Sequence, residues 1–315
     1  MPLSNQFQEL SAQVRNWGRW GDDDQLGTLN LISPEVVREA AGCIQHGRTI
    51  SLAVPLEHDG IQVGFIPGRD NPVRTMHAVN EGMDPDGDPD TFHTSDDHVS
   101  FGLQAGTHWD GLGHVSYSGL LYNGYDASTI TAEDGATRCG IQNLQSVCSR
   151  GVLLDVARAK GTDLLDCPYA ITANDLDEAA AMGGVEVRAG DIVLVRTGRM
   201  SLYHSGGGMA YCLGPKQDGS NAGLSLSTVP WLHEHDVAAV ANDTLVLEVY
   251  PSEVDNLAVH MLHVVDMGLT QGQNWDLEAL SDDCAADGVY EFFLAATPEP
   301  FRGAVGSPVA PVAIK

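Results

Sequence analysis

Three residues with metal-binding or acid–base side chains, His108, Asp110 and His114, follow one another at short, even spacings. Gln104 continues the even series toward the N-terminus. In an extended strand, alternate side chains point to one face, so these spacings would place all four groups on the same side. An imidazole and a carboxylate two residues apart can bind a borderline divalent metal. The stretch therefore indicates a metal site, with exposed polar residues on a strand and loop as the alternative.

Signatures of several other chemistries do not occur in the chain. There is no glycine-rich phosphate loop, no G-x-G-x-x-G fingerprint and no G-x-S-x-G nucleophile elbow. The six cysteines include no C-x-x-C pair and match no zinc-finger spacing, so we expect reduced thiols that are mostly buried. These absences weaken nucleotide-binding and serine-hydrolase interpretations.

Composition narrows the class of protein further. The chain has 315 residues, of which 43% are hydrophobic, enough for one large core or two small ones. Its formal net charge of -27 argues against nucleic acid and anionic membrane surfaces as partners. The chain has no run of about 18 apolar residues, so no membrane span is predicted. The first 20 residues lack the apolar core of a signal peptide. We therefore expect a cytoplasmic protein that acts on a small molecule.

The polar stretch must be positioned by a mixture of strands and helices. Strands are predicted at 49–56, within 98–114, and at 151–156, 191–196, 237–241, 244–249, 289–296 and 307–314. Helices are predicted at 33–47, 172–182, 227–235, 256–267 and 277–285. Residues 57–97 and 201–223 are expected to be long loops at a binding site. The alternation of elements predicts an α/β or α+β class.

No linker divides the chain, so we predict a single domain, 1–315, with an N-terminal arm. Trp17 and Trp20 lie in a glycine-rich, acidic segment near the start. They indicate an arm that docks on a neighbouring subunit or a cap on the same chain.

The stretch 104–114 resembles the signature H-x-G-T-H-x-D-x-P-x-H of the cyclase family of metal-dependent hydrolases, which includes bacterial kynurenine formamidase and isatin hydrolase. Four positions match the signature: Thr107, His108, Asp110 and His114. Gln104 stands in place of the first histidine and Leu112 in place of the proline. A second family block, a histidine-bearing helix followed by a glutamate, is similar to 260–277, with Gln273 where the glutamate would be. Segments 20–30 and 304–314 also resemble the family, so the likeness spans nearly the whole chain.

The resemblance implies a swivelling β/β/α fold, in which a twisted sheet core is packed by helices, and a homodimer or homotetramer. It implies metal ligands at Gln104, His108, Asp110 and Gln273, with His260 near a second metal position. His114 would be the catalytic general base. Family members open an amide or lactam by attack of metal-bound water.

The two glutamines are departures with a chemical consequence. One aspartate, one histidine and two amides carry a single negative charge, too little to hold two divalent cations about 3.5 Å apart. We therefore predict one divalent ion, with manganese favoured over zinc because amide oxygens are hard ligands. Alternatively, Gln104 does not bind and the metal site is weak.

Two histidines and three aromatic residues near these segments can be read either as site residues or as structural residues. His260 and His263 lie one helical turn apart; the spacing of His260 to Gln273 favours a ligand role for it, whereas His263 is expected to be structural. Three aromatic residues are predicted to line the substrate pocket, with core packing as the alternative: Trp109, Tyr117 and Tyr122.

The sequence therefore predicts a metal-dependent hydrolase of a small cyclic or aryl amide, lactam or ester. A degenerate family member that acts as a binding or structural protein is the first alternative. A biosynthetic cyclase that forms a lactone is the second.

Overall fold

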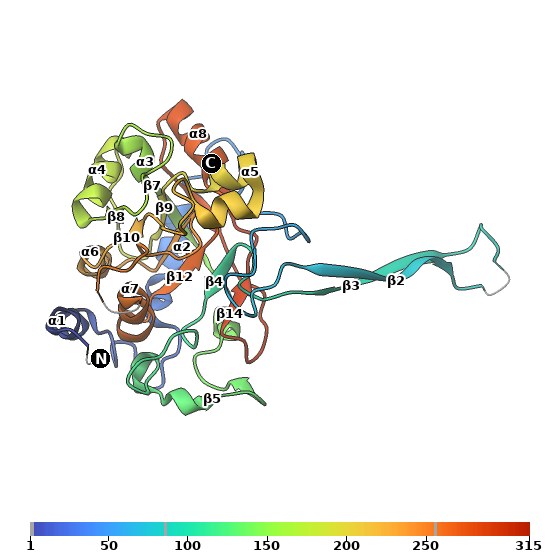
Figure 1. Ribbon diagram of the computed structural model, residues 1–315, viewed down its shortest axis with the longest axis horizontal. Coiled ribbons are helices and arrows are strands. Elements are labelled where there is room, and N and C mark those ends of the chain that lie inside the picture. The colour runs from blue at the N-terminus through green and yellow to red at the C-terminus, as the bar shows by residue number, and fades with distance from the viewer. Residues whose placement is uncertain (1–2, 85–86, 255–256) are drawn as a thin grey trace.

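Two apolar segments predicted as buried strands, β7 (Cys148–Asp155) and β9 (Ile192–Arg196), lie side by side in the middle of a nine-stranded sheet (Figure 1). The computed structural model describes residues 3–84, 87–254 and 257–315. In spatial order the sheet comprises β1 (Thr49–Ser51), β15 (Val312–Ile314), β13 (Glu291–Ala295), β7, β9, β11 (Ala239–Asn242), β12 (Thr270–Gln273), β4 (His108–Asp110) and β14 (Gly306–Pro308). β7, β9, β11 and β12 run parallel, and antiparallel strands flank them on both sides.

Alternate residues of the central strands enter two separate hydrophobic cores. Val193 and Val195 of β9 belong to one core, whereas Ile192 and Leu194 belong to the other. Such a sheet is covered on both faces, which explains why its strands read as continuous apolar runs. The predicted α/β class, with a curled sheet packed by helices, is confirmed.

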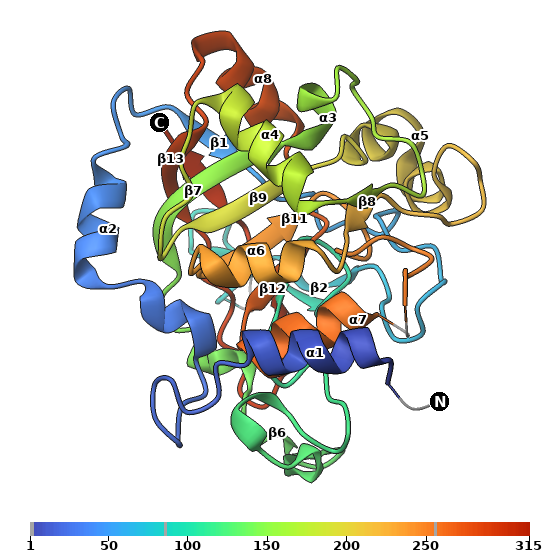
Figure 2. The same cartoon turned by 90° about the vertical axis from the view of Figure 1, so that its left-hand side faces the viewer.

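Helices cover the sheet on both sides (Figure 2). They are α1 (Asn5–Val14), α2 (Pro34–Ala41), α3 (Val156–Ala159), α4 (Ala173–Gly183), α5 (Met200–Leu213), α6 (Thr228–Glu234), α7 (Ala258–His260), the π-helix η5 (Met261–Met267) and α8 (Glu278–Asp287). Single 3₁₀ turns are η1 (Gly27–Leu31), η2 (Tyr122–Gly124), η3 (Ala127–Thr129) and η4 (Ile141–Asn143). Among the described helices, none is long and apolar enough to cross a membrane.

Local capping signals placed several helices correctly. Ser33 caps α2 through a bond from Val36 N, and Thr172 caps α4 with a capping box to Asp175. The helix predicted at 256–267 is present from Ala258, and most of it is the π-helical η5; residue 256 lies outside the described residues. The segment 244–249, predicted as a strand, forms only an isolated bridge between Leu224 and Glu248.

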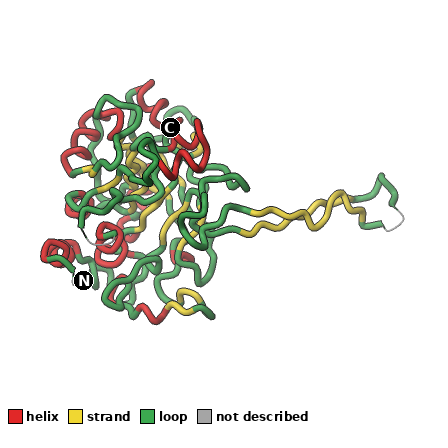
Figure 3. Tube along the Cα trace, viewed as in Figure 1, coloured by secondary structure: helices red, strands yellow, loops and turns green. Residues whose placement is uncertain are grey.

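Part of the loop predicted at 57–97 is a long two-stranded hairpin, whereas residues 57–72 form no helix or strand and residues 85–86 lie outside the described part of the chain. Its strands are β2 (Val73–Gly82) and β3 (His93–Ser100), which project away from the body of the molecule (Figures 1 and 3). Nearly every residue of both strands is exposed, so neither shows the apolar alternation that identifies a half-buried strand. Two further small sheets pair β5 (Ile130–Thr131) with β6 (Gly135–Ala136) and β8 (Ala170–Ile171) with β10 (Gly223–Leu224).

The prediction of a loop at 201–223 was wrong for its first half, which forms α5. Its glycines weaken helix propensity, and Gly207 interrupts the helix with a positive φ of 69°. The helix forms nevertheless because Tyr211 and Cys212 are buried in a small core with Ile61.

The N-terminal segment packs on its own chain. Arg15 forms an ion pair with Asp266 at 2.8 Å, and Trp17 Nε1 donates to Val265 O at 2.7 Å. These contacts fasten the segment to η5 and agree with the cap on the same chain.

Candidate functional site

Three neighbouring strands present the predicted ligands on one face of the sheet. His108 of β4 lies opposite Gln273 of β12, and Asp110 lies opposite Gln271. On its other side, Asp110 lies opposite Gly306 of β14. Directly opposed residues of antiparallel strands point to the same face, so this pairing gathers both glutamines around His108 and Asp110.

His108 is fully buried and held from both ring nitrogens. Nδ1 lies 2.8 Å from Gly106 O, which can only accept, so this nitrogen carries a proton. Nε2 lies 2.8 Å from Gln273 Oε1. In a neutral imidazole Nε2 would then present a lone pair to another lone pair. A histidine that donates one N–H to a carbonyl and directs the other nitrogen at acceptors has the arrangement usual for a metal ligand.

Asp110 has one satisfied oxygen and one unsatisfied oxygen. Its Oδ2 accepts from Gln273 Nε2 at 2.7 Å and from Gln271 Nε2 at 3.2 Å. Its Oδ1 has no hydrogen-bond partner, although the side chain is fully buried. This oxygen lies 3.5 Å from His108 Nε2 and 3.6 Å from His114 Nε2.

The charge of Asp110 depends on its neighbours. Burial alone would raise its pKa, but the neighbouring imidazoles of His114 and His108, when protonated, hold the pKa well below its usual range. The group is therefore a carboxylate with one oxygen free for a cation.

Gln104 reaches the same face from a different backbone setting. It lies in a turn, not in β4, so the argument from strand alternation applies to His108 and Asp110 but not to Gln104. A Cβ added to Gly306 would lie 2.5 Å from Gln104 Nε2. Because Gly306 is the residue opposite Asp110, its missing side chain leaves the space that the Gln104 amide occupies beside the carboxylate.

His114 follows β4 in a bend and opens onto a cavity of about 590 Å³. The charge of Asp110 would raise its pKa, but burial and the positive charges of Arg69, His108 and His260 together lower it. The imidazole is therefore neutral near pH 7 and able to accept a proton.

His260 lies on the same cavity, where Gln273 also emerges. Its Nδ1 lies 2.5 Å from Oε1 of Glu248, a buried carboxylate that also accepts from His260 N at 3.1 Å. Glu248 thus fixes the ring and leaves Nε2 for a ligand.

The three aromatic residues predicted as pocket walls lie elsewhere. Trp109 is fully buried on the opposite face, 4.8 Å from Trp275 between ring centroids, because strand side chains alternate. Tyr122 is buried in a separate core and donates to Asp24 at 2.9 Å. Tyr117 donates to Asp266 at 2.8 Å and lines another cavity. The prediction that they line the pocket of His114 was therefore wrong; its apolar walls are Ile66, Val115, Leu245, Val246, Leu257 and Met261.

Sequence reasoning missed three residues of this region. Gln271 could have been found from its position two residues before Gln273, on the same face of one strand. Glu248 and Arg69 gave no signal, since only the tertiary fold brings them to the cavity. His263, predicted as structural, is buried and connects to Gln271 Oε1 at 3.3 Å.

Comparison with known proteins places the chain among cyclases. The family model described as putative cyclase matches residues 32–249. A solved structure of a novel cyclase is 40% identical over 96% of this chain and 100% of its own, with a TM-score of 0.86. No match was found among curated proteins.

More distant structures share the fold. An isatin hydrolase bound to the product analogue thioisatinate is 17% identical over 87% of this chain and 93% of its own, with a TM-score of 0.58. Isatin hydrolase A from Labrenzia aggregata, bound to benzyl benzoate, is 17% identical over 87% and 94%, with a TM-score of 0.60. The family match covers more than half of the chain, and the chain belongs to the cyclase family.

Proposed function

We propose that the chain is a metal-dependent hydrolase that opens a small cyclic or aryl amide, lactam or ester. One observation carries the proposal. When His108 is neutral with its proton on Nδ1, three acceptor atoms lie together with no donor among them: His108 Nε2, Gln273 Oε1 and Asp110 Oδ1. A cation is what satisfies such a cluster in a buried site.

The donor set fits one hard divalent ion. His108, Asp110 and the Gln273 amide would hold it, with the Gln104 amide beside them. Two of these four ligands are amides. The described residues contain no cluster of three or more His, Cys, Asp or Glu side chains that could hold a metal without them. This composition favours manganese over zinc, and one ion over two. When bound, such an ion lowers the pKa of water and polarises a carbonyl oxygen.

The side chains around the site divide the remaining work. His114 lies at the border between the cluster and the cavity, so it can take a proton from the attacking water and return it to the leaving group. Asp110 stabilises the imidazolium that forms, since its Oδ1 faces His114 Nε2. The apolar walls hold the substrate body against this edge and exclude bulk water.

Metal content and turnover test the proposal together. The purified protein is assayed with isatin, N-formylkynurenine and simple lactones, after loading with manganese and separately with zinc. We expect near-stoichiometric metal that is lost in His108→Ala. His114→Ala should keep the metal but lower kcat at least about a hundredfold. No retained metal under either loading condition would overturn the proposal, and full activity of His114→Ala would overturn the assignment of the base.

A binding protein without metal is the second candidate function. If His108 carries a proton on both nitrogens, Nε2 donates to Gln273 Oε1, and Gln273 Nε2 donates to Asp110. These hydrogen bonds are then satisfied without a metal. Elemental analysis separates the two candidates, because only the hydrolase needs a stoichiometric ion.

We also propose that the protein assembles as a homodimer or homotetramer. The β2–β3 hairpin supports this, because an isolated two-stranded hairpin is marginally stable in water. It exposes large apolar side chains, among them Val79 at 62% and Phe92 at 65%. A cytoplasmic location stays a prediction.

A further inference from the structure

Among the described residues that line the cavity beside His114, Arg69 is the one with a permanent positive charge. Arg69 lies on the segment between β1 and β2 and is half-buried. It lines the same cavity as His114, His260 and Gln273. The side chain is therefore close enough to act on a molecule that occupies the cavity.

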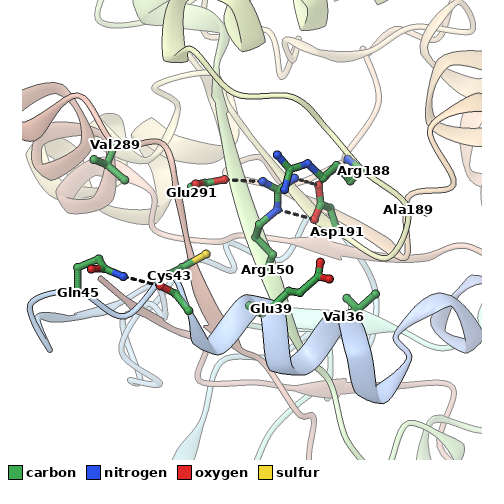
Figure 4. Close-up of a pocket in the computed structure, with 12 residues that line it drawn as sticks. Val36, Glu39, Cys43, Gln45, Arg150, Arg188, Ala189, Asp191, Val289 and Glu291 are labelled. Carbon is green, nitrogen blue, oxygen red and sulfur yellow. Dashed lines mark hydrogen bonds and ion pairs between the residues drawn. The ribbon is translucent and has the colours of Figure 1, made fainter.

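The side chain of Arg69 has no partner in the part of the chain that the structure describes. Among the described residues, no carboxylate forms an ion pair with it and no acceptor takes a hydrogen bond from it. The chain has 43 acidic and only 16 basic residues, so carboxylate partners are abundant. Arg150, for comparison, forms ion pairs with Asp191 and Glu291 beside a different cavity (Figure 4). An unpaired guanidinium on the substrate cavity of so acidic a chain indicates a site for an anion.

The backbone holds Arg69 in place against the cavity. Its N–H donates to Ile66 O at 3.2 Å, and Gly102 N donates to Asp70 O at 3.0 Å. A Cβ on Gly102 would lie 2.9 Å from Arg69 Cα, so only glycine allows this close packing. Gly102 leads directly into the turn of Gln104, which ties the position of Arg69 to that of the metal ligands.

The kind of anion follows from the guanidinium and its surroundings. A guanidinium binds a carboxylate through two parallel hydrogen bonds. Arg69 makes no ion pair with Asp110, whose Oδ1 faces His108 and His114, so its guanidinium is not in contact with the cluster where bond cleavage is proposed. It therefore matches a group of the substrate away from the bond that is cut. The apolar residues that line the rest of the cavity match a hydrophobic body of the substrate.

We propose that Arg69 is a specificity residue that binds a carboxylate carried by the substrate. The preferred substrates are then small acyl compounds with an apolar body and a carboxylate away from the scissile bond. This inference rests on the proposed hydrolase function of the same cavity. The net charge of -27 does not oppose it, because charges beyond about 10 Å are screened at physiological salt.

Binding of benzoate and benzamide by calorimetry tests Arg69 without relying on turnover. The two molecules have the same shape and differ in charge. We expect the wild-type protein, loaded with manganese or treated with a chelator, to bind benzoate at least tenfold more tightly than benzamide. Arg69→Gln should lose that preference and keep its benzamide affinity within twofold, and Arg69→Lys should lie between. Arg188→Gln is the matched control, since Arg188 is an exposed arginine on the other cavity (Figure 4).

The outcomes separate this inference from the proposed function. Unchanged benzoate affinity in Arg69→Gln overturns the inference. Loss of benzoate binding by the wild-type protein after chelator treatment also overturns it, because the metal and not Arg69 would then hold the carboxylate. Kinetics provide the second arm: with 3-formamidobenzoate and formanilide as substrates, Arg69→Gln should raise KM at least tenfold for the first only. If neither anilide is cleaved but benzoate binding still depends on Arg69, the carboxylate site stands and the choice of reaction is wrong.

Discussion

The side-chain amide of Gln273 donates to Asp110 Oδ2 at 2.7 Å, and this bond turns its oxygen toward His108 Nε2, 2.8 Å away. The amide group thus has a fixed orientation, with its acceptor on the side where Asp110 Oδ1 is unsatisfied. A carboxylate at this position would add charge to the cluster but would lose the bond to Asp110. The glutamine therefore stabilises the metal-free site at the expense of metal affinity.

Gln273→Glu should reverse that balance. Without metal, two carboxylates would face each other, and we expect the free energy of unfolding to fall by about 2 kcal/mol. With metal, the added charge should raise affinity at least tenfold. Thermal unfolding with and without a chelator, together with metal titration, measures both effects.

Gln271→Glu is the control for this substitution. It sets the same charge against Asp110, but Gln271 bonds to Asp110 and His263, with no bond to His108. We expect it to destabilise the metal-free protein without improving metal affinity. An equal gain in affinity for both variants would contradict the assigned role of Gln273.

The role of Gln104 can be tested through its neighbour. A methyl group in Gly306→Ala would lie 2.5 Å from Gln104 Nε2 and 3.0 Å from Trp109 O, so the amide must move. If Gln104 is a ligand, Gly306→Ala and Gln104→Ala should each weaken manganese binding at least tenfold. Ser307→Ala is the control, because its hydroxyl donates to Glu299 O at 2.8 Å and it lies opposite Trp109. Wild-type manganese affinity in Gln104→Ala would show that Gln104 does not bind the metal.

His263 should make stability depend on pH. Burial lowers its pKa from 6.5 to about 3, so the folded state keeps it neutral where the unfolded chain takes up a proton. Its contribution to stability is therefore complete above pH 6.5 and falls as the pH drops toward 3, by up to about 1.4 kcal/mol per pH unit.

Urea unfolding at pH 7.5 and pH 5 measures this effect. His263→Gln should be less stable than the wild type at pH 7.5 but should lose less stability between the two values. His58→Gln, at an exposed position, should follow the wild type. A wild-type pH dependence in His263→Gln would contradict the assignment.

Local patterns predicted the elements and the central ligands, and tertiary pairing supplied the rest. Alternation placed His108 and Asp110 on one face, and the same rule places Trp109 on the opposite one, which contradicted its predicted pocket role. The partner strand that brings Gln271 to Asp110 is 161 residues away in the chain, so no local pattern could reveal it. The hairpin was missed because exposed strands need no apolar face.

Removal of the hairpin tests the proposed assembly. Its strands pair in register at Thr75 and His98, so residues 76–97 can be replaced by an Asn-Gly turn without disturbing the base. Met83 and Phe92, 78% and 65% exposed, are removed with it. We expect the wild type to sediment as a dimer or tetramer and the shortened chain as a monomer, since exposed apolar side chains on an isolated hairpin need a covering surface. The melting temperature of the body should change little, because the hairpin strands bury almost nothing.

Analytical ultracentrifugation measures the oligomeric state of both chains. A wild type that sediments as a monomer, or a shortened chain that still assembles, would contradict the role of the hairpin.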